Sequence, residues 1–430
     1  MSLVEKEVTL KNVEQARRNP EFEKRQEIEH KLVPVRPEIL TWLYKENAEP
    51  IEQIYLSNPG DEFSLRVRRI GTGATERFTA TLKDRGEIVD GALRRTEVET
   101  AISPELFHYY QAMGLPRLSK SRAVIADGVH VDFYENNTTP AIVEVEHADA
   151  ELRSETVALV EELGGPLVNQ SDNVAITNEA LAHQQYAERS LEKVPRKPES
   201  LDAFTHRVLG EMIAQYTIGK NQVVVGLTGM SGSGKTTVTR GLQERIVELF
   251  GESYAPIVVS TDDYHFGKTA LEARYGAPYT EWDSPKTYNT EELAADLALL
   301  AEGHPLIKRH FDFETEEPVF DEEVAPSPFV IVEGLYASSK DLHNVRDLHF
   351  ELPTSIATSV GRDIRRLIIE NRANRVFPTP ESRLKYQIET ALPLYLEQGK
   401  PERKAFSASV RPLAERAFML SDVSKLADEI

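Results

Sequence analysis

The sequence predicts two folds in one chain: an antiparallel barrel or sandwich of about seven or eight short strands, then an α/β domain with a parallel sheet. Residues 27–146 contain short runs in which charged and apolar residues alternate, separated by turn-forming Gly, Asn and Asp residues. Residues 223–250 contain an apolar β-branched run, a glycine-rich loop and a run with helical spacing. At 430 residues, the chain is long enough for two or three domains.

The composition is that of a soluble globular protein, with 40% hydrophobic and 28% charged residues. The net charge of −20 argues against nucleic acid as a partner, because a basic face is the usual sign of that function. The absence of cysteine excludes disulfides, thiolate metal sites and cysteine nucleophiles, and it suits a cytoplasmic protein. Because no apolar run approaches membrane-spanning length and the first residues lack a signal-peptide pattern, we expect no membrane partner.

Charged residues recur at every second position along the predicted strands of the N-terminal half. In the first strand, Glu27, Glu29 and Lys31 share one face, because successive side chains of a strand point to opposite sides. The later charged positions are Arg66 and Arg68, Lys83, Glu97 and Glu99, Lys120 and Arg122, Asp132, and Glu144 and Glu146. An ordinary strand would turn such charges to water, and for the first motif alone that interpretation stays open.

The distribution of the two charge signs favours an inward-facing set. Acidic residues come as spaced pairs on three of the predicted strands, whereas the basic pairs lie on others. A closed barrel lined by both signs would bind a polyanion together with its metal ions. Carboxylates are hard oxygen ligands for Mg²⁺ or Mn²⁺, and Arg and Lys bind phosphate oxygens.

This ordered set resembles the CYTH superfamily, the triphosphate tunnel metalloenzymes, over about residues 22–180. The resemblance implies an α+β fold with an eight-stranded antiparallel tunnel barrel that binds a small-molecule triphosphate with Mg²⁺ or Mn²⁺. Members hydrolyse inorganic triphosphate or thiamine triphosphate, or cyclise ATP, and these residues do not separate the subfamilies. The implied metal ligands are Glu27, Glu29, Asp132, Glu144 and Glu146. The implied triphosphate-binding residues are Lys31, Arg66, Arg68, Lys83, Lys120 and Arg122, of which Lys83 is also the implied catalytic residue.

The loop Gly229-Met230-Ser231-Gly232-Ser233-Gly234-Lys235-Thr236 has the spacing of a phosphate-binding loop. Its glycines let successive N–H groups face one anion, and the following helix adds the positive end of its dipole. Lys235 would reach the β- and γ-phosphates of ATP, and the Thr236 hydroxyl would hold Mg²⁺. The predicted ATP-binding residues of the loop are Gly229, Ser231, Gly232, Ser233, Gly234, Lys235, Thr236 and Thr237.

Two later strands end on acidic residues. Asp262 follows a buried strand and is the predicted catalytic residue that orients an acceptor hydroxyl and takes its proton; Asp263 is its neighbour. The alternative is that the two aspartates only cap a helix. Glu333 ends the strand 328–332 and would lie beside Mg²⁺ through a water molecule.

These pieces resemble the uridine kinase and phosphoribulokinase family of P-loop kinases over about residues 220–398. The resemblance implies that Asp283, Phe311 and Asp312 bind the acceptor. It also implies a basic lid containing Arg362, Arg365, Arg366, Arg372 and Arg375, from which we select Arg366 and Arg372 as ATP-binding residues. Phe311 stands where uridine kinases have Tyr, and Glu316 stands where they have a base-reading His, so the acceptor stays open.

The sequence therefore predicts a tunnel domain over residues 1–192, a linker and helix over 193–219, and a kinase domain over 220–430. The predicted function is bifunctional: metal-dependent hydrolysis of a triphosphate and ATP-dependent phosphorylation of a nucleoside or similar hydroxyl acceptor. Two alternatives remain, a kinase with a non-catalytic polyphosphate-sensing or nucleotide-sensing tunnel, and a class IV adenylyl cyclase fused to a kinase. The sequence leaves the oligomeric state open.

Overall fold

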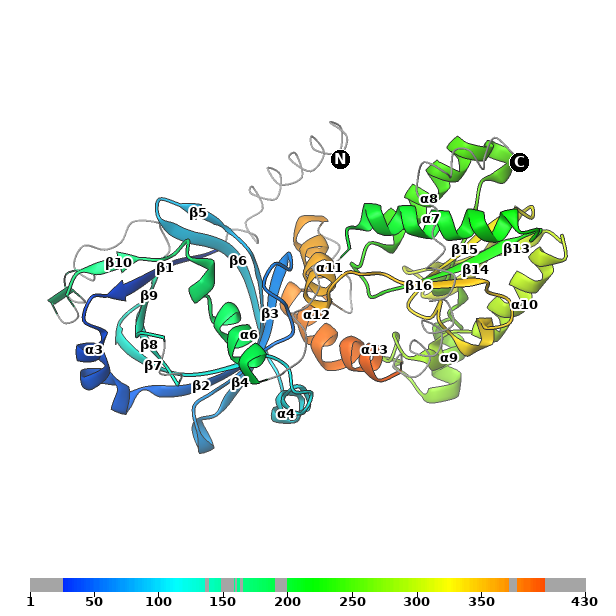
Figure 1. The fold of residues 1–430 in the computed structure, drawn as a ribbon. Coiled ribbons are helices and arrows are strands. Elements are labelled where there is room, and N and C mark those ends of the chain that lie inside the picture. The colour runs from blue at the N-terminus through cyan, green and yellow to red at the C-terminus, as the bar shows by residue number, and fades with distance from the viewer. Residues whose placement is uncertain are drawn as a thin grey trace. The chain divides into compact units, whose positions relative to one another are not determined.

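The computed structural model describes residues 26–135, 139–147, 158, 161–162, 165–189, 199–370 and 377–398 (Figure 1). The chain divides into two compact units. The N-terminal unit contains Met1–Arg196 and Ser355–Glu389, and the C-terminal unit contains Lys197–Thr354 and Thr390–Ile430. Among the described residues, no helix is both long enough and apolar enough to cross a membrane.

The N-terminal unit contains the predicted barrel. Its eight strands are β1 (Gln26–Pro34), β2 (Glu49–Tyr55), β3 (Phe63–Ile70), β4 (Arg77–Asp84), β6 (Ala92–Ala101), β7 (Arg117–Ala126), β8 (Val129–Tyr134) and β9 (Ile142–His147). They pair antiparallel in the order β1-β9-β8-β7-β2-β3-β4-β6, and β6 pairs back with β1 to close the barrel. Two short strands, β5 (Glu87–Val89) and β10 (Leu167–Asn169), extend the sheet from β6 and β1. The predicted eight-stranded antiparallel barrel is therefore confirmed.

Helices cover the outside of the barrel and one of its ends. Leu40 of α3 (Pro37–Tyr44) packs against β8 and β9, and α4 (Pro104–Ala112) buries Phe107 and Tyr110. In α6 (Asn178–Arg189), Leu181 and Ala182 pack against Leu118, Tyr134 and Ile142. These three share strand faces with the charged residues Lys120, Asp132 and Glu144, so α6 fills one end of the barrel (Figure 1).

Two helices from late in the chain pack on the barrel wall. They are α11 (Ile356–Glu370) and α12 (Pro380–Tyr386), which contact β3, β4 and β6. A Cβ atom on Gly361 of α11 would lie only 2.2 Å from the ring of Phe63 on β3. The Tyr110 hydroxyl donates a buried hydrogen bond of 2.7 Å to the Ile388 carbonyl. This packing groups residues 355–389 with the barrel.

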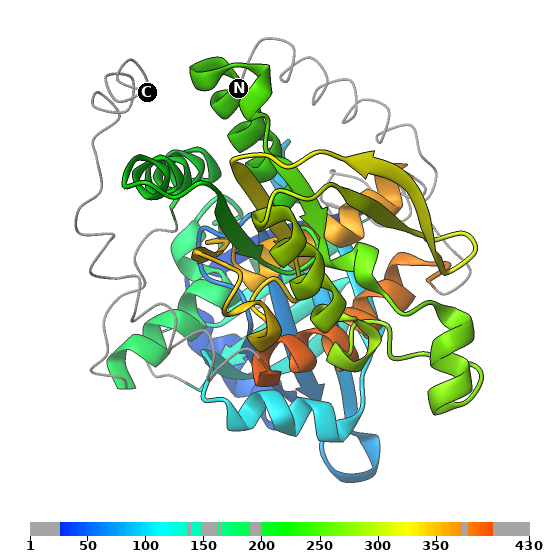
Figure 2. The ribbon, with the colours of Figure 1, turned by 90° about the vertical axis from the view of Figure 1, so that its right-hand side faces the viewer.

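The C-terminal unit is built on a parallel sheet in the order β12-β15-β11-β16, which confirms the predicted α/β fold. Its strands are β11 (Val223–Thr228), β12 (Ile257–Ser260), β15 (Phe329–Gly334) and β16 (Leu348–Glu351). Helices α7 (Leu201–Thr217) and α8 (Lys235–Phe250) pack on one face, and α10 (Thr290–Ala301) packs on the other (Figure 2). All of β11 is buried, as expected for a parallel strand covered on both faces.

Further elements of this unit lie beside the carboxyl ends of the strands. They are the 3₁₀ turn η5 (Thr261–Tyr264), α9 (Lys268–Tyr275), α13 (Leu392–Gln398), and the hairpin of β13 (Leu306–Asp312) and β14 (Glu317–Val324). The turn η5 directly follows β12, and β13 contacts it. Residues 193–198 of the predicted linker lie outside the described residues.

We expect Gly361→Ala to destabilise the protein, because the added methyl group collides with the buried Phe63 ring. Overpacking of this kind costs about 1–3 kcal/mol of unfolding free energy. Gly210 is a matched control, since it also lies within a helix but has no atom within 4 Å of an added Cβ. There Gly→Ala should stabilise by up to about 1 kcal/mol through helix propensity. Urea unfolding monitored by circular dichroism measures both, and equal effects would contradict the proposed collision.

Candidate active sites

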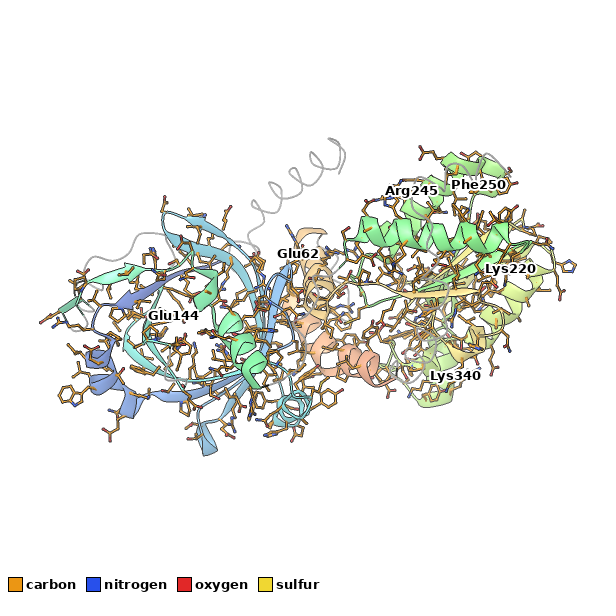
Figure 3. All side chains as sticks on the ribbon, in the orientation of Figure 1. Glu62, Glu144, Lys220, Arg245, Phe250 and Lys340 are labelled. Atoms are coloured by element: carbon orange, nitrogen blue, oxygen red, sulfur yellow. The ribbon has the colours of Figure 1, made fainter. Side chains whose placement is uncertain are left out.

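The charged faces of the barrel strands point inward. Figure 3 shows Glu144 inside the barrel, where its side chain is 4% exposed. The buried charged residues of this lumen are Glu29, Lys31, Lys83, Lys120, Asp132 and Glu144. The opposite faces are apolar: Leu65 and Val67 of β3 are fully buried on the side away from Arg66 and Arg68. The structure thus brings the predicted metal-binding and triphosphate-binding residues together in one interior.

Acids and bases pair across the lumen. Lys31 Nζ lies 3.1 Å from a Glu144 oxygen and 3.4 Å from a Glu29 oxygen. Because these lysine–carboxylate contacts outweigh the cost of burial, the pKa of Lys31 is raised. Several other predicted positions also form ion pairs. Lys83 lies 2.7 Å from Glu27 and 3.0 Å from Glu97, and Arg68 lies 2.6 Å from Glu99. Lys120 and Arg122 both pair with Asp132.

Arg95 is a lumen residue that the sequence prediction missed. Its Nε and Nη2 atoms donate to Glu27 at 2.7 Å and Glu29 at 2.6 Å. Arg95 lies opposite Glu27 in the β1–β6 register, which explains the contact. The signal was the alternation Arg95-x-Glu97-x-Glu99, which places the arginine on the same strand face as the two acids.

Glu146 lies where several carboxylates crowd together in the lumen. Burial, together with the neighbouring Glu144, Glu27 and Glu29, raises the pKa of Glu146 to about 7, although Arg122 opposes the shift. Such crowding of carboxylates fits a divalent cation. Within the described part of the chain, no three His, Asp or Glu groups are already arranged around one metal position, because most of these carboxylates contact Lys or Arg instead.

The lumen also contains an unused donor that fits an anion. Arg66 lies beside Tyr55, and its buried Nε atom has no hydrogen-bond partner among the described residues. A buried guanidinium donor without an acceptor is costly, and a phosphate oxygen is a good acceptor for it. The barrel interior therefore has both parts of a metal–polyphosphate site: crowded carboxylates and a basic group with an open donor.

The glycine loop of the C-terminal unit adopts the backbone that a phosphate cradle needs. Gly232 and Gly234 have φ angles of +78° and +98°, which side chains other than glycine adopt at a cost. Lys235, Thr236 and Thr237 form the first turn of α8, so its N-terminal N–H groups border the loop. Lys235 Nζ donates to the carbonyls of Gly229 and Met230 at 3.0 and 3.2 Å, which places the ammonium group over the loop.

The two predicted strand-end acids lie beside Lys235. Burial raises the pKa of Asp262, and Lys235 opposes that shift. Burial likewise raises the pKa of Glu333. Lys235 opposes this shift, and Asp262 adds to it. Glu333 Oε2 is buried without a hydrogen-bond partner among the described residues, which fits the ligand shell of Mg²⁺.

The close approach of the two acid-bearing segments depends on a glycine. A Cβ atom on Gly334, the residue after Glu333, would lie 1.8 Å from Thr261 Oγ1. Gly334 also has a φ angle of +144°. The absence of a side chain at this position therefore lets the end of β15 reach η5 and brings Glu333 close to Asp262.

The structure separates the roles of the two adjacent aspartates. Asp263 Oδ1 accepts a hydrogen bond of 3.2 Å from the Phe311 N–H, so Asp263 holds β13 in place. The cap of η5 is Ser260, whose hydroxyl accepts from the Asp262 N–H at 3.3 Å. Because Asp262 serves neither purpose and lies beside Lys235, it is the aspartate available for chemistry.

An aromatic cluster lies next to these acids. The His265 ring lies 4.3 Å from Tyr288, 4.7 Å from Phe311 and 6.0 Å from Trp282, measured between ring centroids. Burial lowers the pKa of His265 to about 4, against a smaller opposing effect of Asp283. The ring is therefore neutral at physiological pH. The His265, Tyr288 and Phe311 rings are buried, and Trp282 is the half-buried member of the cluster.

The remaining residues predicted at the acceptor site and in the lid lie outside the aromatic cluster. Asp312 accepts from the Glu314 N–H and the Thr315 hydroxyl, so it caps the hairpin turn. Glu316 lies in that turn and forms an ion pair with Lys268. Arg366 is exposed on α11 in the N-terminal unit, and Arg372 lies outside the described residues.

The family model described as Phosphoribulokinase / Uridine kinase family matches residues 224–371. A uridine kinase of Bacillus subtilis is 30% identical over 160 residues, which are 36% of this chain and 71% of that protein. An inorganic pyrophosphatase of Arabidopsis thaliana is 28% identical over 196 residues, which are 45% of this chain and 27% of that protein. A solved structure of an inorganic triphosphatase is 25% identical, and the match covers 36% of this chain and 93% of that one with a TM-score of 0.22.

The buried His265 ring should make the protein less stable in acid. Its pKa is about 4 in the folded state and about 6.5 in an unfolded chain. Between these values the unfolded chain binds the proton and the folded protein does not, so unfolding free energy falls as pH falls from about 6.5 to about 4. The full loss is about 3 kcal/mol.

We expect His265→Phe to remove that part of the pH dependence, measured as urea midpoints at pH 7 and pH 5. His304→Phe, at an exposed histidine, is the comparison variant that shows what replacing a histidine by phenylalanine does by itself. An unchanged slope in His265→Phe would show that other groups cause the acid sensitivity.

Proposed function

The chain belongs to the phosphoribulokinase / uridine kinase family over residues 224–371, and we propose that its C-terminal unit transfers the γ-phosphoryl group of ATP to a hydroxyl acceptor. The observation that carries the proposal is the convergence of Lys235, Asp262 and Glu333 beside the glycine loop. These groups are the parts that phosphoryl transfer needs: a cation for the phosphates, a carboxylate for the hydroxyl and a carboxylate for Mg²⁺.

In this reaction the loop N–H groups and Lys235 bind the β- and γ-phosphates. Asp262 accepts a hydrogen bond from the acceptor hydroxyl and takes its proton as the oxygen attacks phosphorus. Burial raises the pKa of Asp262, which strengthens it as a base. Thr236 and Glu333 would hold Mg²⁺, which would offset the charge of the phosphates.

We place the acceptor at Trp282 and Asp283, the half-buried edge of the aromatic cluster whose His265, Tyr288 and Phe311 rings are buried. An aromatic side chain at the edge of the site favours a planar, uncharged ring over an anionic group. This supports a nucleoside or a similar ring-bearing alcohol as acceptor. A panel of nucleosides and sugars, scored by ADP formation, identifies it.

We expect Asp262→Asn to lower kcat for ATP-dependent phosphorylation by roughly 10²–10⁴-fold with little change in ATP affinity, because the variant lacks the base. Asp263→Asn is the matched comparison, and its main effect should be on thermal stability, since Asp263 holds the Phe311 N–H. A stopped assay for ADP and a thermal melt separate the two. Equal losses of kcat in both variants would contradict the division of roles.

We propose in addition that the barrel hydrolyses a short phosphate chain in the presence of Mg²⁺ or Mn²⁺. The support is the closed lumen with Arg66, Arg68, Lys83 and Arg122 facing its carboxylates. Glu27, Glu29, Asp132, Glu144 and Glu146 would hold the metal, which would activate water and offset phosphate charge. Lys31 and Lys83, which contact these carboxylates, would move to phosphate oxygens.

The similar proteins suggest which substrates to test first. An inorganic pyrophosphatase and an inorganic triphosphatase are among them, so inorganic triphosphate and pyrophosphate come first, followed by thiamine triphosphate and ATP. Phosphate release that requires Mg²⁺ or Mn²⁺ and is abolished by Lys83→Ala, but kept in Lys235→Ala, would establish the barrel as the site. Binding without turnover would make it a sensing module instead.

The neighbouring arginines of β6 provide a sharper test of the lumen. Arg95 contacts Glu27 and Glu29, whereas Arg94 lies on the opposite face of the strand. We expect Arg95→Ala to lower triphosphate turnover by about tenfold or more, because it removes one of the two basic partners of each of these buried carboxylates and a cation from the lumen. Arg94→Ala should stay within about twofold. Similar losses in both variants would show that the effect is not specific to the lumen.

A further inference from the structure

His130 of β8 is a lumen residue that belongs to neither the predicted metal-binding set nor the predicted triphosphate-binding set. It lies two positions before Asp132, so both side chains share the inner face of the strand, and its register partner on β9 is Glu144. Tyr134, two positions after Asp132 on the same face, packs against α6. His130 therefore lies toward the end of the barrel away from that helix.

The His130 ring forms no close polar contact that would occupy its nitrogens. The Nδ1 atom is buried and has no hydrogen-bond partner among the described residues. The Nε2 atom lies 4.0 Å from a Glu146 carboxylate oxygen, which is too far for a hydrogen bond. Because a buried polar nitrogen without a partner is costly, the ring has bonding capacity that a ligand could use.

Glu146 is held loosely in comparison with other carboxylates of the lumen. Arg122 Nη1 lies 3.7 Å from its carboxylate, whereas Glu27 and Glu29 each have a basic group within 2.7 Å. The Glu146 side chain is 39% exposed. On the inner face of β9, Ile142 packs against α6 and Glu146 lies four positions further on, so Glu146 and His130 lie toward the same end of the barrel.

The distance between these two groups fits a shared cation. Nitrogen and oxygen ligands lie about 2.1 Å from Zn²⁺ and similar ions, so two ligand atoms of one ion are at most about 4.2 Å apart. The 4.0 Å between His130 Nε2 and the Glu146 oxygen lies within this limit. Small rotations of both side chains would bring the atoms to the shorter spacing of a regular shell, whose other positions would go to water or phosphate oxygens.

We propose that His130 is a nitrogen ligand, beside Glu146, of the divalent cation in the barrel, and that it makes the barrel favour a transition-metal ion such as Co²⁺ or Zn²⁺ over Mg²⁺. The inference rests on the proposed function, since it concerns the metal that the barrel would use. Mg²⁺ keeps oxygen ligands and much of its water, whereas imidazole is a good ligand for transition metals. A lumen with oxygen ligands alone would show a smaller preference.

The test measures metal binding, not turnover. Calorimetry on the full chain gives the Kd of Co²⁺ and of Mg²⁺, and the visible absorption of bound Co²⁺ reports its ligands. We expect His130→Ala to change this spectrum and to weaken Co²⁺ binding by about tenfold or more, since even residues that only orient a metal ligand are worth about 10–100-fold in affinity. The Kd of Mg²⁺ should change by less than about threefold, because Mg²⁺ takes oxygen ligands.

Three further variants assign the effect. His108→Ala, at an exposed histidine of α4, is the matched control and should leave the Co²⁺ affinity within about twofold. Glu146→Gln should weaken the binding of both metals, because the carboxylate serves both. His130→Gln keeps more of the side-chain volume, so it replaces His130→Ala if circular dichroism shows that the alanine variant does not fold, and the same loss of Co²⁺ affinity is expected.

The outcomes separate this inference from the proposed function. An unchanged Kd of Co²⁺ in the His130 variants, while Glu146→Gln weakens both metals, overturns the inference and leaves the metal-dependent barrel standing. Equal losses of Co²⁺ and Mg²⁺ affinity in the His130 variants also overturn it, since His130 would then shape the site without acting as a nitrogen ligand. If Glu146→Gln changes neither metal, the inference and the proposed barrel function both fail.

Discussion

The arrangement of the N-terminal unit depends on burying charges of both signs inside a closed barrel. Asp132 and Lys120 are almost wholly inaccessible to water, and each would be costly to bury alone. Pairing offsets the free-energy cost of burying these charges. Closure of the barrel brings some of the pairs together, because Arg95 of β6 meets Glu27 only where β6 joins β1. The fold and the charged interior therefore stabilise each other. Under the proposed function these pairs would exchange partners, since a metal ion and a phosphate chain carry the same two signs.

Strand alternation made much of this predictable from the sequence. The two-residue period placed Glu27, Glu29 and Lys31 on one face, and the structure puts that face inside. Arg95 was missed although its spacing from Glu97 and Glu99 puts it on their strand face, and the pairing of β6 with β1 shows that it meets Glu27. The contacts of α11 with β3 were beyond local reasoning. They depend on a glycine that faces Phe63 from almost 300 positions away in the chain.

In the C-terminal unit too, local sequence motifs were predictable, whereas contacts between distant residues were not. The glycine loop and both strand-end acids were identifiable because spacing and strand ends are local properties. Asp262 was the aspartate selected from the sequence, and the structure adds that its neighbour Asp263 accepts a hydrogen bond from the Phe311 N–H of β13. Asp312 was expected at the acceptor, whereas its carboxylate closes a hairpin turn, a role that short-range hydrogen bonding of Asp explains.

The placement of α6 has a consequence for the kind of phosphate chain that the barrel can process. Because this helix packs into one end, the proposed ligand would have to arrive and depart past the opposite rim. A linear polymer could not thread through; only its terminus would reach the carboxylates, while the remainder stayed in solvent. Cleavage would then proceed stepwise from chain ends.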